Sequence, residues 1–327
     1  MTDTGATEPL AVAELGSFHI GGREAALSGL ATRILQVTPA APPLEINPNG
    51  EFEVEQMYVQ YARLAAPRSR YPLLMWHGGG LTGVTWETTP DGRPGWMNLF
   101  LRYGHDVFVS DAVERGRASW ARFPEVFATE PFFRPKQTAW EDFRIGPSWH
   151  SDPENRIAYP DTQFPVAAFD QFAKQMVPRW GTNDLCTQAA YDELVERVGP
   201  CVLLAHSQGA IFALRAAAAA PAMVKAVVAL EPGGAPDPGR EDISAMRDTP
   251  VLCVWGDHID DSEVWSDLRR SCQRYWQAQS DQGGIAETID LPREGITGNS
   301  HMIMMDRNSD LVGAKIQQWL KSRGLMK

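Results

Sequence analysis

Short apolar runs alternate with longer segments of helical character from residue 71 to the C-terminus. The apolar runs predict buried strands, and the longer segments predict helices that pack against them. Strands are expected at residues 73–76, 107–110, 202–205, 226–230, 251–255 and 287–291, and helices at residues 96–103, 208–219, 262–279 and 311–322. This order predicts an α/β fold whose mostly parallel sheet is covered by helices on both faces.

The N-terminal part of the chain has a different pattern. Residues 51–62 alternate in polarity and are rich in β-forming side chains, which predicts an antiparallel strand. Residues 17–20 predict another strand, with Gly21 and Gly22 forming a turn after it. Residues 38–50 are rich in proline and are expected to form a loop.

Residues 117–185 break the alternation of strands and helices. This stretch is rich in aromatic residues and proline, and residues 166–176 within it predict a helix. We interpret it as a partly helical cap, inserted into an α/β core made of residues 1–116 and 186–327. Its aromatic rings are expected to form the core of the cap and, together, to wall an apolar pocket. Trp86 and Phe164 are the candidate substrate contacts.

The composition narrows the class of protein. With 327 residues, 43% hydrophobic and 22% charged, the chain has the composition of a soluble globular protein. Its formal net charge of −11 argues against nucleic acid or an anionic membrane as a partner. Residues 1–15 lack the features of a secretory signal, so a cytoplasmic location is expected; a periplasmic one stays open if a leader was removed. The four cysteines lack zinc-like spacing, and no metal site is expected.

A candidate nucleophile lies in the pentapeptide of residues 205–209, Ala-His-Ser-Gln-Gly. The pentapeptide follows a predicted strand and precedes a predicted helix, which is the context that a nucleophile elbow requires. Small residues on either side of Ser207 allow the sharp turn that exposes a serine hydroxyl. The alternative interpretation is a serine in a tight turn with no chemistry.

A serine needs a base, and position along the chain favours one histidine. His301 lies in the loop between the last predicted strand and the last predicted helix, where this architecture carries its base. The other histidines lie before the sheet, beside the serine, in the insertion or in other loops: His19, His77, His105, His150, His206 and His258. His301 is therefore the predicted general base.

The third member of a triad is a carboxylate that orients the histidine. Glu231 ends the apolar strand at residues 226–230, whereas Asp257 and Asp260 follow the next strand. The position of the aspartates is the commoner one for this acid in the fold. Spacing alone leaves Glu231 and the two aspartates as equal alternatives.

The turn His77–Gly80 supplies a candidate oxyanion hole. Three glycines follow His77 directly after a predicted strand, so backbone N–H groups can approach a developing negative charge. Gly79 is the expected donor, with Gly80 as an alternative, and the N–H of Gln208 is the expected partner. No Lys-Ser or Lys-Thr follows the glycines, which excludes a P-loop.

These motifs together resemble the α/β-hydrolase superfamily, and longer strings resemble a small family of atypical bacterial esterases over nearly the whole chain. The strings are Leu81-Thr82-Gly83, Thr88-Thr89-Pro90-Asp91-Gly92-Arg93, Asp161-Thr162-Gln163-Phe164-Pro165, Gly256-Asp257-His258-Ile259, and Gly298-Asn299-Ser300-His301-Met302 with Asp306-Arg307-Asn308. The resemblance implies a Ser-Glu-His triad, which favours Glu231 over Asp257 and Asp260. It also implies ester hydrolysis, no cofactor and a homodimer. The glycine-only turn after His77 departs from the family, and because this turn lines the acyl site, we expect a different substrate preference.

The sequence therefore predicts a serine hydrolase that cleaves carboxylic esters of a hydrophobic or aromatic small molecule through an acyl-enzyme intermediate. A lactonase, an amidase or a thioesterase would use the same triad. The alternative from another class is a non-catalytic ligand-binding protein on a hydrolase scaffold.

Overall fold

The computed structural model describes residues 9–120 and 122–327. Residues 1–8 and residue 121 lie outside the described residues. The prediction about a secretory signal rests partly on residues 1–8, and residue 121 belongs to the predicted cap. The described strands are β1 Val12–Leu27, β2 Arg33–Leu35, β3 Leu44–Ile46, β4 Gly50–Leu64, β5 Leu73–Trp76, β6 Val107–Asp111, β7 Cys201–His206, β8 Val224–Leu230, β9 Val251–Trp255 and β10 Ala286–Asp290.

The main sheet has eight strands in the order β1-β4-β6-β5-β7-β8-β9-β10. β1 pairs with β4, and β4 with β6, in antiparallel orientation, whereas β6, β5, β7, β8, β9 and β10 are parallel neighbours. The predicted mostly parallel sheet with antiparallel strands at its N-terminal edge is confirmed. Parallel strands end at one edge of a sheet, so the loops after β5, β7, β8 and β9 meet there.

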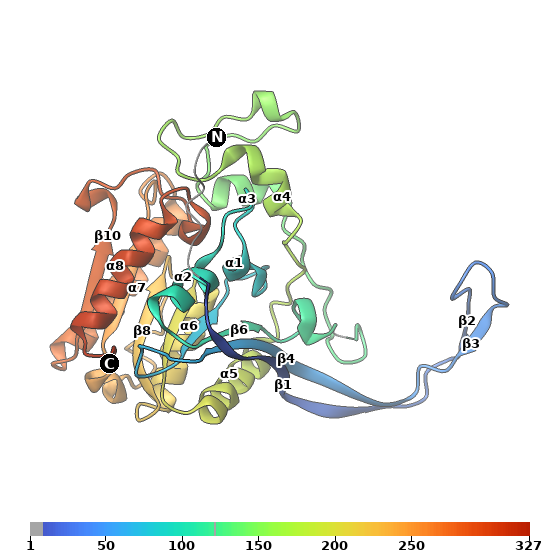
Figure 1. Cartoon of the computed structure of the whole chain (residues 1–327). Coiled ribbons are helices and arrows are strands. Elements are labelled where there is room, and N and C mark those ends of the chain that lie inside the picture. Colours follow the sequence, from blue (N-terminus) through green and yellow to red (C-terminus); the bar gives the residue numbers. More distant parts are fainter. Residues whose placement is uncertain (1–8, 121) are drawn as a thin grey trace.

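Helices cover both faces of the sheet (Figure 1). The helices are α1 Val84–Glu87, α2 Trp96–Tyr103, α3 Lys136–Asp142, α4 Phe169–Ala173, α5 Asp184–Val198, α6 Gln208–Ala219, α7 Glu263–Asp281 and α8 Ser309–Ser322. Alternation along β5 explains the two layers, because Leu73 and Met75 join the core beneath α2 and α8, whereas Leu74 and Trp76 join the core beneath α5, α6 and α7.

Most of the predicted elements are confirmed to within a few residues, and the exceptions have physical reasons. β1 runs straight through Gly21 and Gly22, so the predicted turn there is wrong. The glycines instead permit close packing, since a Cβ on Gly21 would lie 2.7 Å from the Cβ of Ala190 on α5 and one on Gly22 would lie 2.8 Å from the carbonyl oxygen of Val54 on β4. α5 itself was not predicted, and β3 lies within the predicted loop at residues 38–50.

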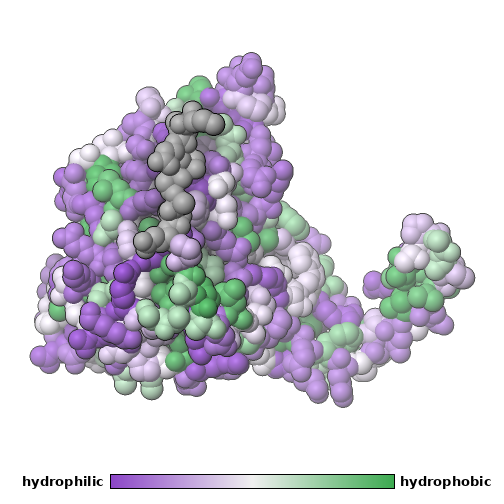
Figure 2. All heavy atoms as spheres, viewed as in Figure 1, coloured by the Kyte–Doolittle hydropathy of each residue, from purple (hydrophilic) through white to green (hydrophobic). Residues whose placement is uncertain are grey.

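An arm projects from the body of the protein. β4 pairs with β6 only between Tyr58 and Ala62, and the rest of the β1–β4 ribbon extends away to a tip formed by β2 and β3 (Figure 1). Leu35, Leu44 and Ile46 share one face of this tip and are exposed to solvent. Apolar atoms gather on the tip in the space-filling view (Figure 2). The tip therefore exposes apolar surface that the body of its own chain does not cover.

The insertion at residues 117–185 lies above one end of the sheet, where α3 and α4 are labelled (Figure 1). Phe127 and Trp180 form a small cluster of their own, whereas other buried aromatic side chains of the insertion join the main core. Trp140, Phe143, Phe169 and Phe172 belong to the same hydrophobic cluster as Trp96 on α2. The insertion is thus packed directly onto the core, and this fixes the residues that it contributes to the site.

Candidate active site

Ser207 occupies a strained turn between β7 and α6. Its backbone has φ 54° and ψ −120°, a conformation that non-glycine residues rarely adopt. The turn is tight enough that a Cβ on Gly209 would lie 2.7 Å from the carbonyl oxygen of His77. The N–H of Ser207 donates to the carbonyl of Leu230 at 3.0 Å, which ties the turn to the end of β8. This geometry is that of a nucleophile elbow.

Ser207 and His301 line one cavity of about 380 Å³. Apolar side chains of α6 and α7 form one wall of it, and charged side chains at the insertion form another. These walls include Arg134, Phe143, Arg179, Asp184, Ile211, Trp265 and Leu268. In the described part of the chain no hydrogen bond joins the side chains of Ser207 and His301, a contact that often tightens only when substrate binds.

His301 is held on all sides. Its Nδ1 lies 3.1 Å from Oε2 of Glu231, and its backbone N–H donates to the carbonyl of Phe143 at 2.9 Å. The rings of Phe143 and Trp265 lie against the imidazole, with centroids 5.3 and 4.3 Å away. An Nδ1–H that donates to Glu231 leaves Nε2 free to accept a proton from a serine.

Glu231 is completely buried and directly follows β8, with a positive φ of 45°. Besides facing His301, its carboxylate accepts hydrogen bonds from the N–H of Gly256 and from the guanidinium of Arg144. Gly256 leaves room for this contact, because a Cβ there would lie 3.0 Å from Oε1 of Glu231. A buried carboxylate with these three partners is fixed in position and compensated in charge.

Sequence reasoning missed Arg144, which lies in the insertion far from the other site residues in the chain. Its side chain is buried, ion-paired with Glu231, and donates from Nε to the carbonyl of Asp257 at 2.7 Å. The guanidinium carbon lies 4.6 Å from the ring centroid of Trp265, and Nη1 has no hydrogen-bond partner among the described residues. No local motif marks this arginine, so only the three-dimensional structure could find it.

The pKa of His301 is lowered well below its usual value. Burial is the largest cause, and the positive charges of Arg144 and then Arg134 add to it. A lowered pKa keeps the imidazole neutral, and so able to act as a base, down to a more acidic pH.

Replacing Arg144 with Met should raise the pKa of His301. The variant lacks the cation that disfavours imidazolium and leaves the negative charge of Glu231 uncompensated. The acidic limb of kcat/KM against pH should therefore move to higher pH than in the wild type. Arg144→Lys keeps the charge and should leave the limb close to its original position. An unmoved limb in Arg144→Met, or one that moves to lower pH, would contradict this electrostatic role.

The alternative acids do not reach His301. Asp257 accepts backbone N–H groups on both carboxylate oxygens, from His258 at 2.8 Å and from Gly298 at 2.9 Å. Asp260 is exposed. The structure thus brings Glu231 to the histidine and uses Asp257 to connect two loops.

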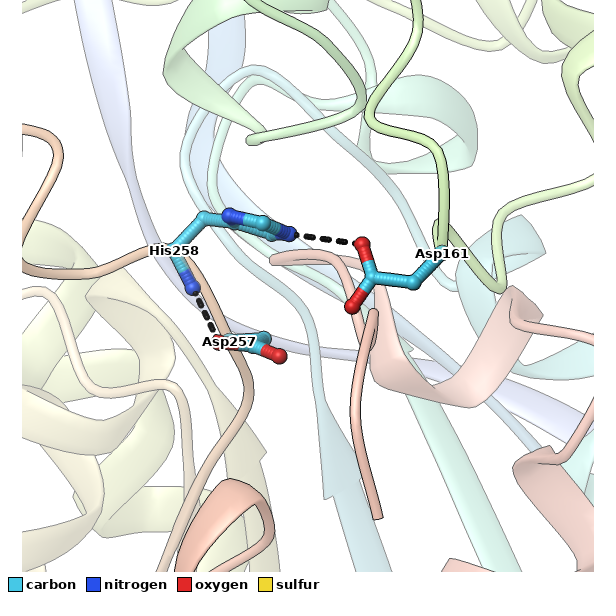
Figure 3. A group of neighbouring side chains, drawn as sticks. All are labelled: Asp161, Asp257 and His258. Carbon is cyan, nitrogen blue, oxygen red and sulfur yellow. Dashed lines mark hydrogen bonds and ion pairs between the residues drawn. The ribbon is translucent and has the colours of Figure 1, made fainter.

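Asp257 also belongs to a polar group with Asp161 and His258 (Figure 3). In the described chain, these are the residues whose potential metal-ligand atoms gather within 4.8 Å of one another. His258 Nε2 lies 3.1 Å from Oδ1 of Asp161, Nδ1 lies 3.0 Å from Asp261, and the ring stacks on Tyr159. The group therefore has internal partners and connects the insertion to the loop after β9.

The glycine turn after β5 lies against the elbow. A Cβ on Gly78 would lie 2.9 Å from the Cβ of Ser207, so the approach depends on glycine. Among the described residues, the N–H groups of Gly79 and Gln208 donate to no protein acceptor, and Gln208 opens helix α6, where such N–H groups are free. Gly80 has φ 73° and its carbonyl accepts from Val177 at 2.9 Å.

His77 has a structural role in this turn. Its Nε2 accepts the N–H of Ala112 at 3.0 Å, and Nδ1 lies 2.8 Å from the carbonyl of Gly78. Burial is the main cause that lowers the pKa of His77 to about 4, so the ring is neutral at physiological pH.

Trp86 and Phe164 require a correction. Both are fully buried in the hydrophobic core, and neither lines the cavity at Ser207. The aromatic side chains that do line this cavity are Phe143 and Trp265. All four side chains are buried, but only Phe143 and Trp265 lie at the wall of the cavity, and the sequence pattern does not reveal this difference.

The fold and the elbow define the class, which is that of the α/β-hydrolases. No family model matches the chain. A solved structure of a novel bacterial esterase is 35% identical, aligns with a TM-score of 0.83, and the match covers 98% of this chain and 99% of the esterase. The probable secreted lipase phiG of Fungal sp. (strain ATCC 74256) is 25% identical over 329 residues, covering 84% of this chain and 88% of the lipase.

The chain therefore belongs to the family of this bacterial esterase, a family of carboxylic ester hydrolases within the α/β-hydrolase superfamily. Within the described residues, no helix is both long enough and apolar enough to cross a membrane.

Proposed function

We propose that this protein hydrolyses carboxylic esters by acyl transfer to water, with Ser207 as nucleophile, His301 as general base and Glu231 as the acid that orients His301. The observation that carries the proposal is the contact between His301 Nδ1 and Glu231 at 3.1 Å, beside the cavity that Ser207 lines from its strained turn. The family of the chain supports the same chemistry.

The reaction has two halves in this proposal. Ser207 attacks the ester carbonyl while its proton passes to Nε2 of His301, and the N–H groups of Gly79 and Gln208 stabilise the tetrahedral oxyanion. The C–O bond to the alcohol then breaks, and the alcohol leaves with the proton from His301. Water attacks the acyl-enzyme with His301 again as base, which releases the carboxylic acid and restores Ser207.

The shape of the cavity supports a substrate with a hydrophobic or aromatic group. Ile211 on α6 and Trp265 and Leu268 on α7 form an apolar wall, and Phe143 of the insertion faces the same space. Residues 117–185 act as a cap in this proposal, because Phe143 and other insertion residues line the cavity.

A substrate panel tests the proposal against its alternatives. Purified protein is assayed with matched carboxylic esters, lactones, amides and thioesters of graded size. We expect the highest kcat/KM on the esters. Preference for another acyl compound would identify a lactonase, an amidase or a thioesterase with the same triad, and no turnover of any of them would favour a ligand-binding protein.

The cytoplasmic location remains a prediction, and the similar fungal lipase is described as secreted.

We also propose that the chain forms a homodimer through its arm. A two-stranded hairpin is marginally stable on its own in water, and the tip of the arm exposes Leu35, Leu44 and Ile46 on one face. An exposed apolar patch on a projecting element is typical of an interaction surface. A second copy of this chain is the partner that we propose for this patch. Contact across a two-fold axis would cover the apolar tips of both arms at once.

Replacing Leu35 and Leu44 together with Asp should convert the dimer into a monomer. The two residues face each other across β2 and β3, so two charges there oppose burial of the tip. Light scattering after gel filtration should give twice the chain mass of 36.2 kDa for the wild type and the chain mass for the variant. Glu45→Gln, on the opposite face of the tip, is the control and should remain dimeric. A monomeric wild type would contradict the proposal.

A further inference from the structure

Arg179 lies beside the turn proposed as the oxyanion hole. Its Nη1 lies 3.0 Å from the position that a Cβ on Gly79 would take, and Arg179, Gly79 and Ser207 line the same cavity. The backbone of Arg179 is fixed by two hydrogen bonds with Phe132, at 2.8 and 3.0 Å. These bonds fix the point from which the side chain of Arg179 extends to the edge of the site.

The charge of Arg179 has no counter-ion in contact with it. Within the described residues no carboxylate oxygen lies within 4.0 Å of its guanidinium, and its buried Nε has no hydrogen-bond partner. The other arginine of the cavity, Arg134, is ion-paired with Asp142. A partly buried guanidinium without a partner has unused donors that match a carboxylate.

The neighbouring charges add to the positive potential at this end of the cavity. Arg115 is buried, and its Nε and Nη1 have no partner among the described residues. Burial lowers the pKa of Arg115 to about 10, with Arg179 contributing, so Arg115 remains charged at neutral pH. Asp184 is the nearby opposing charge, and it is exposed and accepts a hydrogen bond from the side chain of Gln208 at 3.1 Å.

We propose that Arg179 forms a carboxylate-binding subsite and that the enzyme prefers half-esters, in which a free carboxylate stands at the far end of a short acyl chain. This inference rests on the proposed function, because the subsite is defined by its distance from the acyl group on Ser207. The apolar wall on α6 and α7 then takes the alcohol part of the ester. Arg179 adjoins the turn that carries the Gly79 donor, so the carboxylate lies on the acyl side of the scissile bond.

The test compares two ethyl esters of nearly the same size and shape, one of them charged and the other neutral. Monoethyl glutarate carries a carboxylate, and the ethyl ester of glutaramic acid carries a carboxamide of the same shape. Wild-type kcat/KM should be higher for the half-ester. Arg179→Met should lower kcat/KM for the half-ester by about 10- to 100-fold and change that for the carboxamide by less than about 3-fold, because a charge-assisted hydrogen bond is lost only with the anion.

Two controls separate this subsite from folding and from the triad. Arg240→Met, an exposed arginine away from the cavity, should leave both substrates unchanged. Binding of glutarate to the Ser207→Ala variant, measured by calorimetry, should disappear when Arg179→Met is added, and this readout does not need turnover. Equal losses on both esters, or no preference in the wild type, would overturn the subsite while leaving the esterase proposal standing. Turnover by Ser207→Ala would instead overturn the esterase proposal itself.

Discussion

The Ser207→Ala variant is expected to lose ester turnover almost completely while it folds normally. Removing the nucleophile of a serine hydrolase lowers kcat by about 10⁴-fold or more, because the acyl-enzyme can no longer form. The hydroxyl of Ser207 makes no hydrogen bond among the described residues, so its removal leaves no buried group without a partner. The free energy of unfolding should change by less than about 0.5 kcal/mol.

Initial rates with a p-nitrophenyl ester and thermal unfolding of the same samples check both parts of this expectation. Ser280→Ala is the matched control, because Ser280 is exposed on α7 and lies outside the cavity. The control should keep wild-type activity. Turnover by Ser207→Ala close to that of Ser280→Ala would remove Ser207 from the mechanism.

The second large effect is expected for Glu231→Gln. A neutral side chain cannot stabilise the imidazolium form of His301, and kcat should fall by about 10²- to 10⁴-fold. The substitution also leaves Arg144 as a buried charge without its partner, since the two form an ion pair in the core. Breaking a buried pair in this way costs about 3–5 kcal/mol of folding free energy, so the variant should also unfold at lower temperature.

A double variant separates these two consequences. Replacing Glu231 with Gln and Arg144 with Met removes both buried charges, and it should recover much of the lost stability but none of the lost activity. Asp257→Asn and Asp260→Asn are the comparison for the acid itself. If either of these aspartate variants has the larger loss in kcat, the histidine is oriented by a different carboxylate from the one that we propose.

Local patterns in the sequence predicted most of the fold. The strands β5 and β9 and the helices α2 and α6 have the predicted boundaries, because each is a continuous apolar or helix-forming run that ends in a glycine, a proline or a polar residue. Ser207 and His301 could be predicted as candidates because each lies in a loop beside such an element. Position did not separate Glu231 from Asp257 and Asp260, because all three follow predicted strands, and only the resemblance favoured Glu231.

The parts that were missed depend on contacts between distant segments. Arg144 reaches Glu231 from 87 positions away in the chain, and nothing near it in the sequence marks a buried cation. Gly21 and Gly22 suggested a turn, whereas in the structure Gly21 allows the approach of α5 and Gly22 lies close to the backbone of β4. Trp86 and Phe164 are aromatic, as residues that line apolar pockets often are, but both lie in the core. The type of residue and its neighbours in the sequence do not show which of these two positions it takes.

Covalent labelling tests directly whether Ser207 is the nucleophile. The wild-type protein is incubated with a fluorophosphonate, and its intact mass and its proteolytic peptides are then measured. We expect one adduct per chain, located on Ser207, which a saturating ester slows and which the Ser207→Ala variant does not form. An adduct on a different residue, or an unmodified Ser207 in protein that still hydrolyses esters, would exclude Ser207 as the nucleophile.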